Sequence, residues 1–206
     1  MAEVFPSRAW PAWAAALAAL VGGVVAGAGV KAAERYGLPG ASDFGNYFGL
    51  WILLAAAIAA WSHSRRDAVL HVVIFLLAMV ASFYVSTLLL LGYFLTHLFL
   101  AWTVVALVLA PPFAALVWQA RGTGWMPALA TALPIGLLLA EAYSLRWVLG
   151  IHGVQFGFDV AAAAALLMIL PKGYAQRLRV LALAPVIALG ARVVIEYAWG
   201  VVTRVI

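Results

Sequence analysis

The 206-residue chain contains no cysteine and few charged residues. Without cysteine it has no disulfide, no thiolate metal site and no iron–sulfur cluster. Asp, Glu, Lys and Arg make up 9% of the residues and apolar residues 67%, whereas soluble domains carry about 25% charged and about 45–50% apolar residues. We therefore interpret the chain as a polytopic membrane protein.

Motifs of intramembrane enzymes are also missing. The sequence has no HExxH zinc motif, no GxSG element with a partner histidine, and no pair of aspartates in YD and GxGD contexts. The last apolar segment lacks a lysine for a retinal Schiff base, and His71 and His97 fall near opposite ends of adjacent spans, which argues against a shared haem. We expect no metal and no cofactor, and an enzyme is the least favoured class.

The positive net charge does not indicate nucleic-acid binding. The chain has a formal charge of +5 and a pI of 9.9, but its basic residues lie in short links between apolar runs, as membrane topology predicts. The expected partner is the lipid bilayer, and no nucleic-acid partner is expected.

Seven apolar segments are predicted to cross the membrane, because a span needs about 20 apolar residues. The first is interpreted as a span and not as a cleaved signal peptide. Residues 68–120 contain no charge, and this run is divided at Gly92 and Tyr93. The prediction is a single all-α domain over residues 1–206, with spans at 10–30, 44–62, 68–91, 95–119, 125–145, 155–170 and 180–203.

The distribution of Lys and Arg predicts a cytoplasmic N-terminus. In that orientation the cytoplasmic links hold seven basic residues: Arg8, Arg65, Arg66, Arg121, Lys172, Arg177 and Arg179. The opposite side holds four: Lys31, Arg35, Arg146 and Arg204.

Small residues recur every fourth position along the first span. The two rows are Ala14/Ala18/Gly22/Ala26 and Ala15/Ala19/Gly23/Gly27. Such rows let another helix approach closely. The neighbour is either another helix of this chain or a partner subunit. The pattern resembles, weakly, the first helix of the substrate-binding subunits of energy-coupling-factor transporters, which contact their partner through AxxxA repeats.

Prolines mark two of the spans. Pro111 and Pro112 are predicted to break the fourth span, because they free the carbonyls of Leu107 and Val108. In the fifth span Pro127, Pro134 and Glu141 are spaced by seven residues and share one face. We expect this face to be turned towards protein or a cavity.

The polar residues of the spans gather in the half opposite the cytoplasm. Arg192 lies about 18 Å into the last span at 1.5 Å per residue, with Glu196 one turn further on. The set consists of Asp43, Asn46, His97, Glu141, Arg146, His152, Asp159, Arg192 and Glu196. A charge at this depth is costly and marks a functional site by default. The asymmetry predicts a polar pocket that opens outward.

Three interpretations of this set stay open. In the first, the set binds a solute or ion, with Arg192 as anion anchor, Glu141 and Glu196 as ion, proton or hydrogen-bond partners, and Tyr143, Tyr197 and Trp199 as possible lining. In the second, Arg192, Glu196 and Glu141 form a structural charge triad, and residues near helix ends are ordinary caps. The third is a proton relay. The candidate ligand-binding residues are Glu141, Tyr143, Arg192, Glu196, Asp159, His97 and Asp43.

Two stretches resemble a known family. They are GNYFGLWILLAAAIAAWSHSRRDAVLHVVIFLLAMVASFYV at 45–85 and ARGTGWMPALATALPIGLLLAEAYSL at 120–145. They are similar to an uncharacterised family of bacterial multi-pass membrane proteins, known as a domain of unknown function. The resemblance implies a location in the bacterial plasma membrane and places Glu141 and Tyr143 in a shared element. It implies no activity.

The leading functional hypothesis is a bacterial plasma-membrane protein that binds a small solute or ion in an outward-facing polar pocket. It would be a transporter or the membrane-embedded binding subunit of one. The alternatives are an accessory or scaffold protein with a structural charge network, and an intramembrane enzyme acting on a lipid-linked substrate.

Overall fold

A computed structural model describes the backbone of residues 11–38, 44–45, 47–146 and 149–205, and their side chains except at 12, 149, 151 and 195–205. Within these residues the chain is helical and contains no strand, so the prediction of an all-α protein is confirmed. The elements are α1 (Ala12–Arg35), α3 (Gly49–Trp61), α4 (Arg65–Leu91), α5 (Thr96–Val108), α6 (Ala110–Val117), the 3-10 helix η1 (Trp118–Arg121), α7 (Trp125–Leu145), α8 (Leu149–Ile169) and α9 (Tyr174–Val205).

Each of the seven predicted spans coincides with a helical segment. Five segments are long and apolar enough to cross a membrane: Trp13–Arg35, Arg65–Leu91, Thr96–Arg121, Trp125–Leu145 and His152–Ile169. The remaining two are α9 and α3. Helix α3 has only 13 residues, or about 20 Å at 1.5 Å per residue, which is shorter than the hydrocarbon core of about 30 Å. The chain is therefore a multi-pass helical bundle with five segments that can span a membrane, and α3 is too short to span one alone.

Local sequence explains where the long helices start and stop. Ser64 caps α4 by accepting a hydrogen bond from the amide of Asp67 at 3.0 Å. At the other end Gly92 adopts a left-handed conformation with φ of 77°, as the predicted bend requires. The predicted break in the fourth span falls at Leu109, so the two prolines occupy the first turn of α6, where a missing N–H is tolerated.

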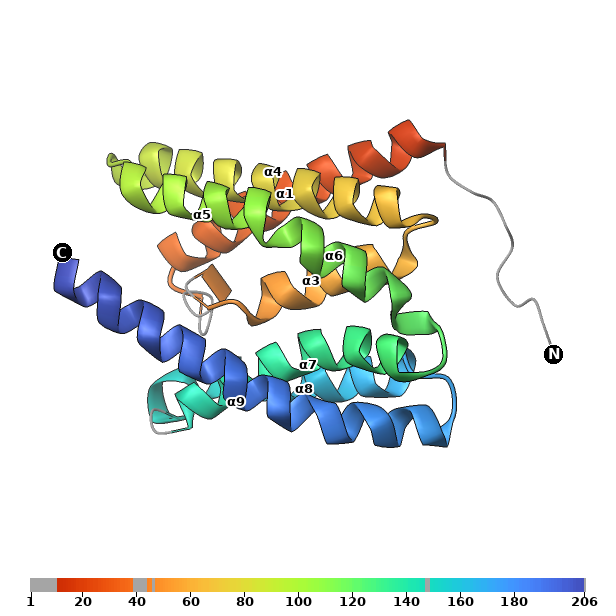
Figure 1. Ribbon diagram of the computed structural model, residues 1–206. Coiled ribbons are helices and arrows are strands. Elements are labelled where there is room, and N and C mark those ends of the chain that lie inside the picture. Colours follow the sequence, from red (N-terminus) through yellow and green to blue (C-terminus); the bar gives the residue numbers. More distant parts are fainter. Residues whose placement is uncertain (1–10, 39–43, 46, 147–148, 206) are drawn as a thin grey trace.

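The bundle has three tiers (Figure 1). Helices α1, α4 and α5 form one side, and α7, α8 and α9 form the other. Between them lie α3 and α6, which contact α4 on one side and α7 on the other. Helix α3 also contacts α8. The start of α3 is therefore enclosed by helices from both sides of the bundle.

The helices alternate in direction along the chain, except that α5, α6 and η1 together make one crossing of the bundle (Figure 1). The links that follow α3, η1 and α8 lie at one end of the bundle, whereas α1, α4 and α7 end at the opposite end. The basic residues Arg65, Arg121 and Lys172 therefore share one end, as the predicted topology requires. Which end faces the cytoplasm stays a prediction.

One of the two small-residue rows of α1 packs inside the chain. A Cβ atom at Gly23 would overlap the carbonyl oxygen of Phe75 in α4, and one at Gly27 would overlap that of Met79. The backbones of α1 and α4 are thus in close contact along this row, as in other helix pairs with small residues at the interface. The opposite face of α1 exposes apolar side chains, namely Trp13, Leu17, Val21, Val24 and Val25.

Candidate functional site

Three polar side chains from two helices form a buried cluster. Glu141 comes from α7 and is 5% exposed, whereas Gln155 and Asp159 come from α8 and are 0% exposed. Gln155 and Asp159 are four residues apart and so lie on the same face of their helix. The Gln155 Nε2 atom donates a hydrogen bond to Oδ1 of Asp159 at 2.7 Å. Glu141 lies close to both side chains.

The first turn of α3 completes the cluster. The backbone N–H of Phe48 donates to Oε1 of Glu141 at 2.6 Å, and the amide of Gly49 also faces this carboxyl group. The first amides of a helix have no acceptor within the helix and carry partial positive charge. No side chain caps α3 locally, so the carboxylate of Glu141 serves as its cap from another helix.

Gly49 is the point at which α3 touches α8. A Cβ atom there would overlap Oδ1 of Asp159 and lie 2.6 Å from Nε2 of Gln155. The absence of a side chain lets the backbone of α3 approach the polar face of α8. Gly49 therefore sets the distance between the amides that bind Glu141 and the side chains of Gln155 and Asp159.

The cluster contains more acceptors than donors. Among the described residues, Oε2 of Glu141, Oε1 of Gln155 and Oδ2 of Asp159 are buried without a hydrogen-bond partner. Buried polar atoms in proteins are nearly always hydrogen-bonded, and all three of these atoms are oxygens that accept. The arrangement is therefore suited to a proton, a cation or a donor group of a solute.

The cluster offers few ligands for a metal ion. Within the described part of the chain, no group of three or more His, Cys, Asp or Glu side chains is arranged to hold a metal ion. The cluster has two carboxyl groups and one carboxamide, whereas Ca²⁺ takes about six to eight oxygen ligands.

Arg192 lies against Tyr143, and none of the described hydrogen bonds of Glu141 involves Arg192. The guanidinium carbon of Arg192 lies 4.4 Å from the ring centroid of Tyr143, and that of Arg146 lies 3.3 Å from it. Tyr143 is 43% exposed. The described contacts of Glu141 are instead with α3 and α8.

The other predicted site residues are not joined to the cluster. His97 is exposed at the start of α5. Asp43 and Asn46 lie outside the described residues, as do the side chains of Glu196, Tyr197 and Trp199. His152 precedes Gln155 by one turn on α8, and its ring meets that of Tyr47 edge-on at 5.2 Å.

The depth of Asp159 differs from the prediction. The sequence placed Asp159 at the start of the sixth span, as a possible solvated cap, but α8 begins at Leu149 and Asp159 is fully buried in its interior. Polar residues before position 155 extend the helix further than hydropathy indicates. Gln155 and Gly49 were missed as site residues, although the spacing of Gln155 and Asp159 is visible in the sequence.

A small cavity lies on the other side of the first turn of α3. It has a volume of about 50 Å³ and is lined mainly by aromatic residues: Gly45, Tyr47, Phe48, Trp51, Met79, Val80, Phe83, Tyr84 and Trp102. The ring of Phe48 contacts that of Trp102 at 5.4 Å between centroids. Phe48 therefore borders the cavity with its ring and binds Glu141 with its amide.

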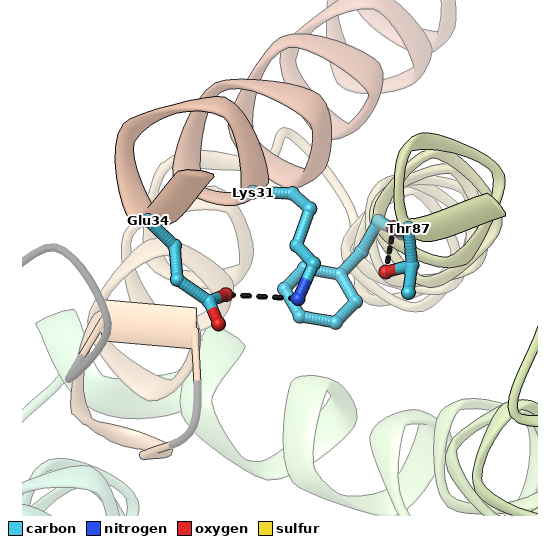
Figure 2. Close-up of polar contacts among 4 residues, drawn as sticks. Lys31, Glu34 and Thr87 are labelled. Atoms are coloured by element: carbon cyan, nitrogen blue, oxygen red, sulfur yellow. Dashed lines mark hydrogen bonds and ion pairs between the residues drawn. The ribbon is translucent and has the colours of Figure 1, made fainter. Parts of the chain in front are cut away.

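A second buried charge is neutralised locally. Lys31 of α1 is 6% exposed, and its Nζ atom lies 3.0 Å from Oε2 of Glu34. Figure 2 shows this pair beside Thr87 of α4, and the ammonium group also lies 5.0 Å from the ring centroid of Phe83. This is the ion pair that the described residues form, and neither Glu141 nor Asp159 takes part in it.

The fold and the buried polar cluster define a multi-pass α-helical membrane protein. Comparison with protein families assigns it more closely. Residues 6–200 match the profile described as "Family of unknown function (DUF6518)", and the chain belongs to this family. No curated protein and no solved structure matches the chain.

Proposed function

We propose that this chain is a transport protein of the bacterial plasma membrane, or the membrane-embedded binding subunit of a transporter. It binds a small solute or ion at one end of its helical bundle. The binding site is centred on Glu141, Gln155 and Asp159. Arg192 of α9 lies against Tyr143, which is on a neighbouring face of α7. Arg192 provides a positive charge for an anionic part of the solute.

The observation that carries this proposal is the set of three buried oxygens without a partner in the described part of the chain. A structural network would be expected to satisfy its own hydrogen bonds, because a half-satisfied network in a low-dielectric interior is less stable than an apolar core. Polar residues within a membrane are otherwise rare and mark pathways for ions and substrates. The free acceptors are therefore best explained by a bound species, either a solute or an ion.

The short helix α3 supports the same function. Transport proteins commonly place the N-terminus of an interrupted helix at the binding site, where its amides face charged groups. Here the amides of Phe48 and Gly49 begin a 13-residue helix and point at Glu141. Because the N-terminus of α3 lies inside the bundle, it places partial positive charge at the binding site, and we propose that α3 is the element that moves during transport.

Native mass spectrometry of the protein purified in mild detergent tests the proposal. The wild-type chain is expected to retain a small ligand, and Glu141→Gln and Asp159→Asn are expected to lose it while remaining monodisperse. Glu34→Gln is the matched control, since it removes a carboxylate outside the cluster. Arg192→Leu is expected to weaken retention with a modest loss of stability.

Two outcomes would contradict the proposal. In the first, the wild-type protein carries no ligand, even after incubation with a small-molecule extract of the host cell. This result would favour the scaffold interpretation. Folded variants that retain the ligand as well as wild type would move the site away from Glu141 and Asp159. An unfolded Arg192→Leu variant would instead identify Arg192 as a structural member, because an uncompensated buried charge is strongly destabilising.

A further inference from the structure

We propose that the cluster carries one exchangeable proton, held on Asp159 beside an ionised Glu141, and that this proton couples the transport of the solute. The inference rests on the proposed function, because a buried proton site has this use only if a solute moves. It identifies the coupling ion, which the transport hypothesis leaves open.

The charges around the cluster require a positive species. Glu141 and Asp159 interact electrostatically, and both are buried. From α3 the described groups that face them are the backbone amides of Phe48 and Gly49, and from α8 the facing group is Gln155. His152, three residues before Gln155, lies against the ring of Tyr47. The guanidinium groups of Arg146, which follows α7, and of Arg192 on α9 lie against the ring of Tyr143. Two adjacent carboxylates in a low-dielectric site cannot both remain ionised.

The hydrogen bonds of the two acids differ and so assign the proton. Glu141 accepts from the amide of Phe48 and faces that of Gly49, so the partial positive charge of the α3 terminus stabilises its ionised form. Asp159 receives one hydrogen bond, from the neutral side chain of Gln155. A proton on Oδ2 of Asp159 converts one of the three unpartnered acceptors into a donor that one of the other two can accept.

The packing favours a proton over a larger ion. The backbone of α3 at Gly49 lies against Asp159 and Gln155 so closely that a methyl group does not fit. The cavity of about 50 Å³ is lined by other residues and lies beyond Phe48. A proton needs no cavity and satisfies two oxygens at once, whereas a metal ion needs several more ligands.

His152 provides a route between the cluster and the end of the bundle. It lies three residues before Gln155, at a kink where its own backbone is non-helical (φ −115°, ψ 28°). It is half-buried, whereas Gln155 and Asp159 are fully buried. Histidine is the side chain that exchanges protons most readily near neutral pH. In the step proposed here, a cationic group of the solute takes the place of the proton beside Glu141, and Asp159 releases that proton outward through His152. When the solute leaves, the reverse transfer protonates Asp159 again, so the two carboxylates are never left together without a positive partner.

Infrared difference spectroscopy of the protein in lipid nanodiscs tests this assignment. The wild-type protein at neutral pH is expected to show the carbonyl stretch of one buried protonated carboxyl group, which shifts in D₂O and disappears on raising the pH. Asp159→Asn should remove the band, and the control Glu34→Gln should keep it unchanged. Glu141→Gln should keep the band, because Asp159 stays buried, but the band should disappear at a lower pH, because the neighbouring negative charge is gone. His152→Phe should slow the exchange in D₂O without removing the band.

Three results would overturn the inference. Wild-type protein without the band holds no such proton. A band that survives in Asp159→Asn but is lost in Glu141→Gln places the proton on the other acid. A rise in melting temperature with NaCl, relative to choline chloride, that depends on Asp159 would identify Na⁺ as the bound species. Wild-type protein that shows the infrared band but retains no ligand in native mass spectrometry would contradict the proposed transport function. The assignment of the proton to Asp159 would still hold in that case.

Discussion

The backbone of Gly49 in the first turn of α3 lies directly against the carboxylate of Asp159 in the middle of α8. A Cβ atom at position 49 would overlap Oδ1 of Asp159. Gly49→Ala must therefore displace either α3 or the carboxylate. We expect a loss of about 1–3 kcal/mol, as for other overpacked sites, together with loss of ligand retention. Thermal unfolding in detergent and native mass spectrometry measure the two effects.

Gly157, on the same helix as Asp159, offers the control for this variant. A Cβ atom at position 157 would have no neighbouring atom within 4 Å, so Gly157→Ala is expected to raise stability by about 0.5–1 kcal/mol. The double variant Gly49→Ala/Asp159→Ala should recover part of the stability lost in Gly49→Ala, because the overlapping atoms are removed together. Equal melting temperatures for wild type and Gly49→Ala would show that the space between Gly49 and Asp159 can accommodate a methyl group.

The contact between α1 and α4 leads to a second prediction. A methyl group at Gly23 or Gly27 would meet main-chain oxygens of α4, which cannot rotate away. Gly23→Ala is therefore expected to separate the two helices and to lower stability by about 1–3 kcal/mol. Gly29→Ala, at a position with open space on the same helix, should leave the melting temperature unchanged or slightly higher. If Gly23→Ala behaved like Gly29→Ala, the close packing of α1 on α4 would be excluded.

Gln176 is predicted to hold the start of α7 to α9. Its side chain is 3% exposed; Nε2 donates to the carbonyl of Gly124 at 2.9 Å, and Oε1 accepts from the amide of Gly124 at 3.1 Å. Gln176→Leu leaves both backbone groups without this partner, and each such loss costs about 1–3 kcal/mol. Urea or thermal unfolding should show a clear decrease.

Gln119 is the matched control for Gln176. The described hydrogen bond of its side-chain amide goes to a carbonyl of the preceding turn, that of Ala115 at 3.5 Å. Gln119→Leu should therefore change stability by less than about 0.5 kcal/mol. A variant at Gln176 as stable as wild type would mean that water replaces both hydrogen bonds and that this end of the bundle is solvated.

The helices could be predicted from the sequence because a membrane requires long apolar segments with satisfied backbones. Polarity also identified Glu141 and Asp159, since any carboxylate inside such a segment is unusual. The partner of Glu141 could not be predicted, because hydropathy does not determine how a helix is rotated about its axis. Glu141 and Tyr143 are two positions apart, or about 200° around a helix, so they face α8 and Arg192 respectively.

The sequence also did not predict the site residues that have a neutral side chain or no side chain. Gln155 carries no charge and gave no signal in the count of charged residues, although it is fully buried and bonded to Asp159. Gly49 contributes only by lacking a side chain, a role that depends on the distance to another helix. Both become evident once α3 and α8 are placed side by side.

The orientation of the bundle is the last prediction, and the chain is well suited to testing it. Because the sequence contains no cysteine, each single-cysteine variant carries one thiol and needs no altered background. With a cytoplasmic N-terminus, Leu38→Cys and Tyr93→Cys should react with a membrane-impermeant maleimide on intact cells. His63→Cys and Thr123→Cys, which are exposed at the opposite end of the bundle, should react only after permeabilisation. Labelling in the reverse order would invert the topology and place the cluster of Glu141 and Asp159 near the cytoplasmic surface.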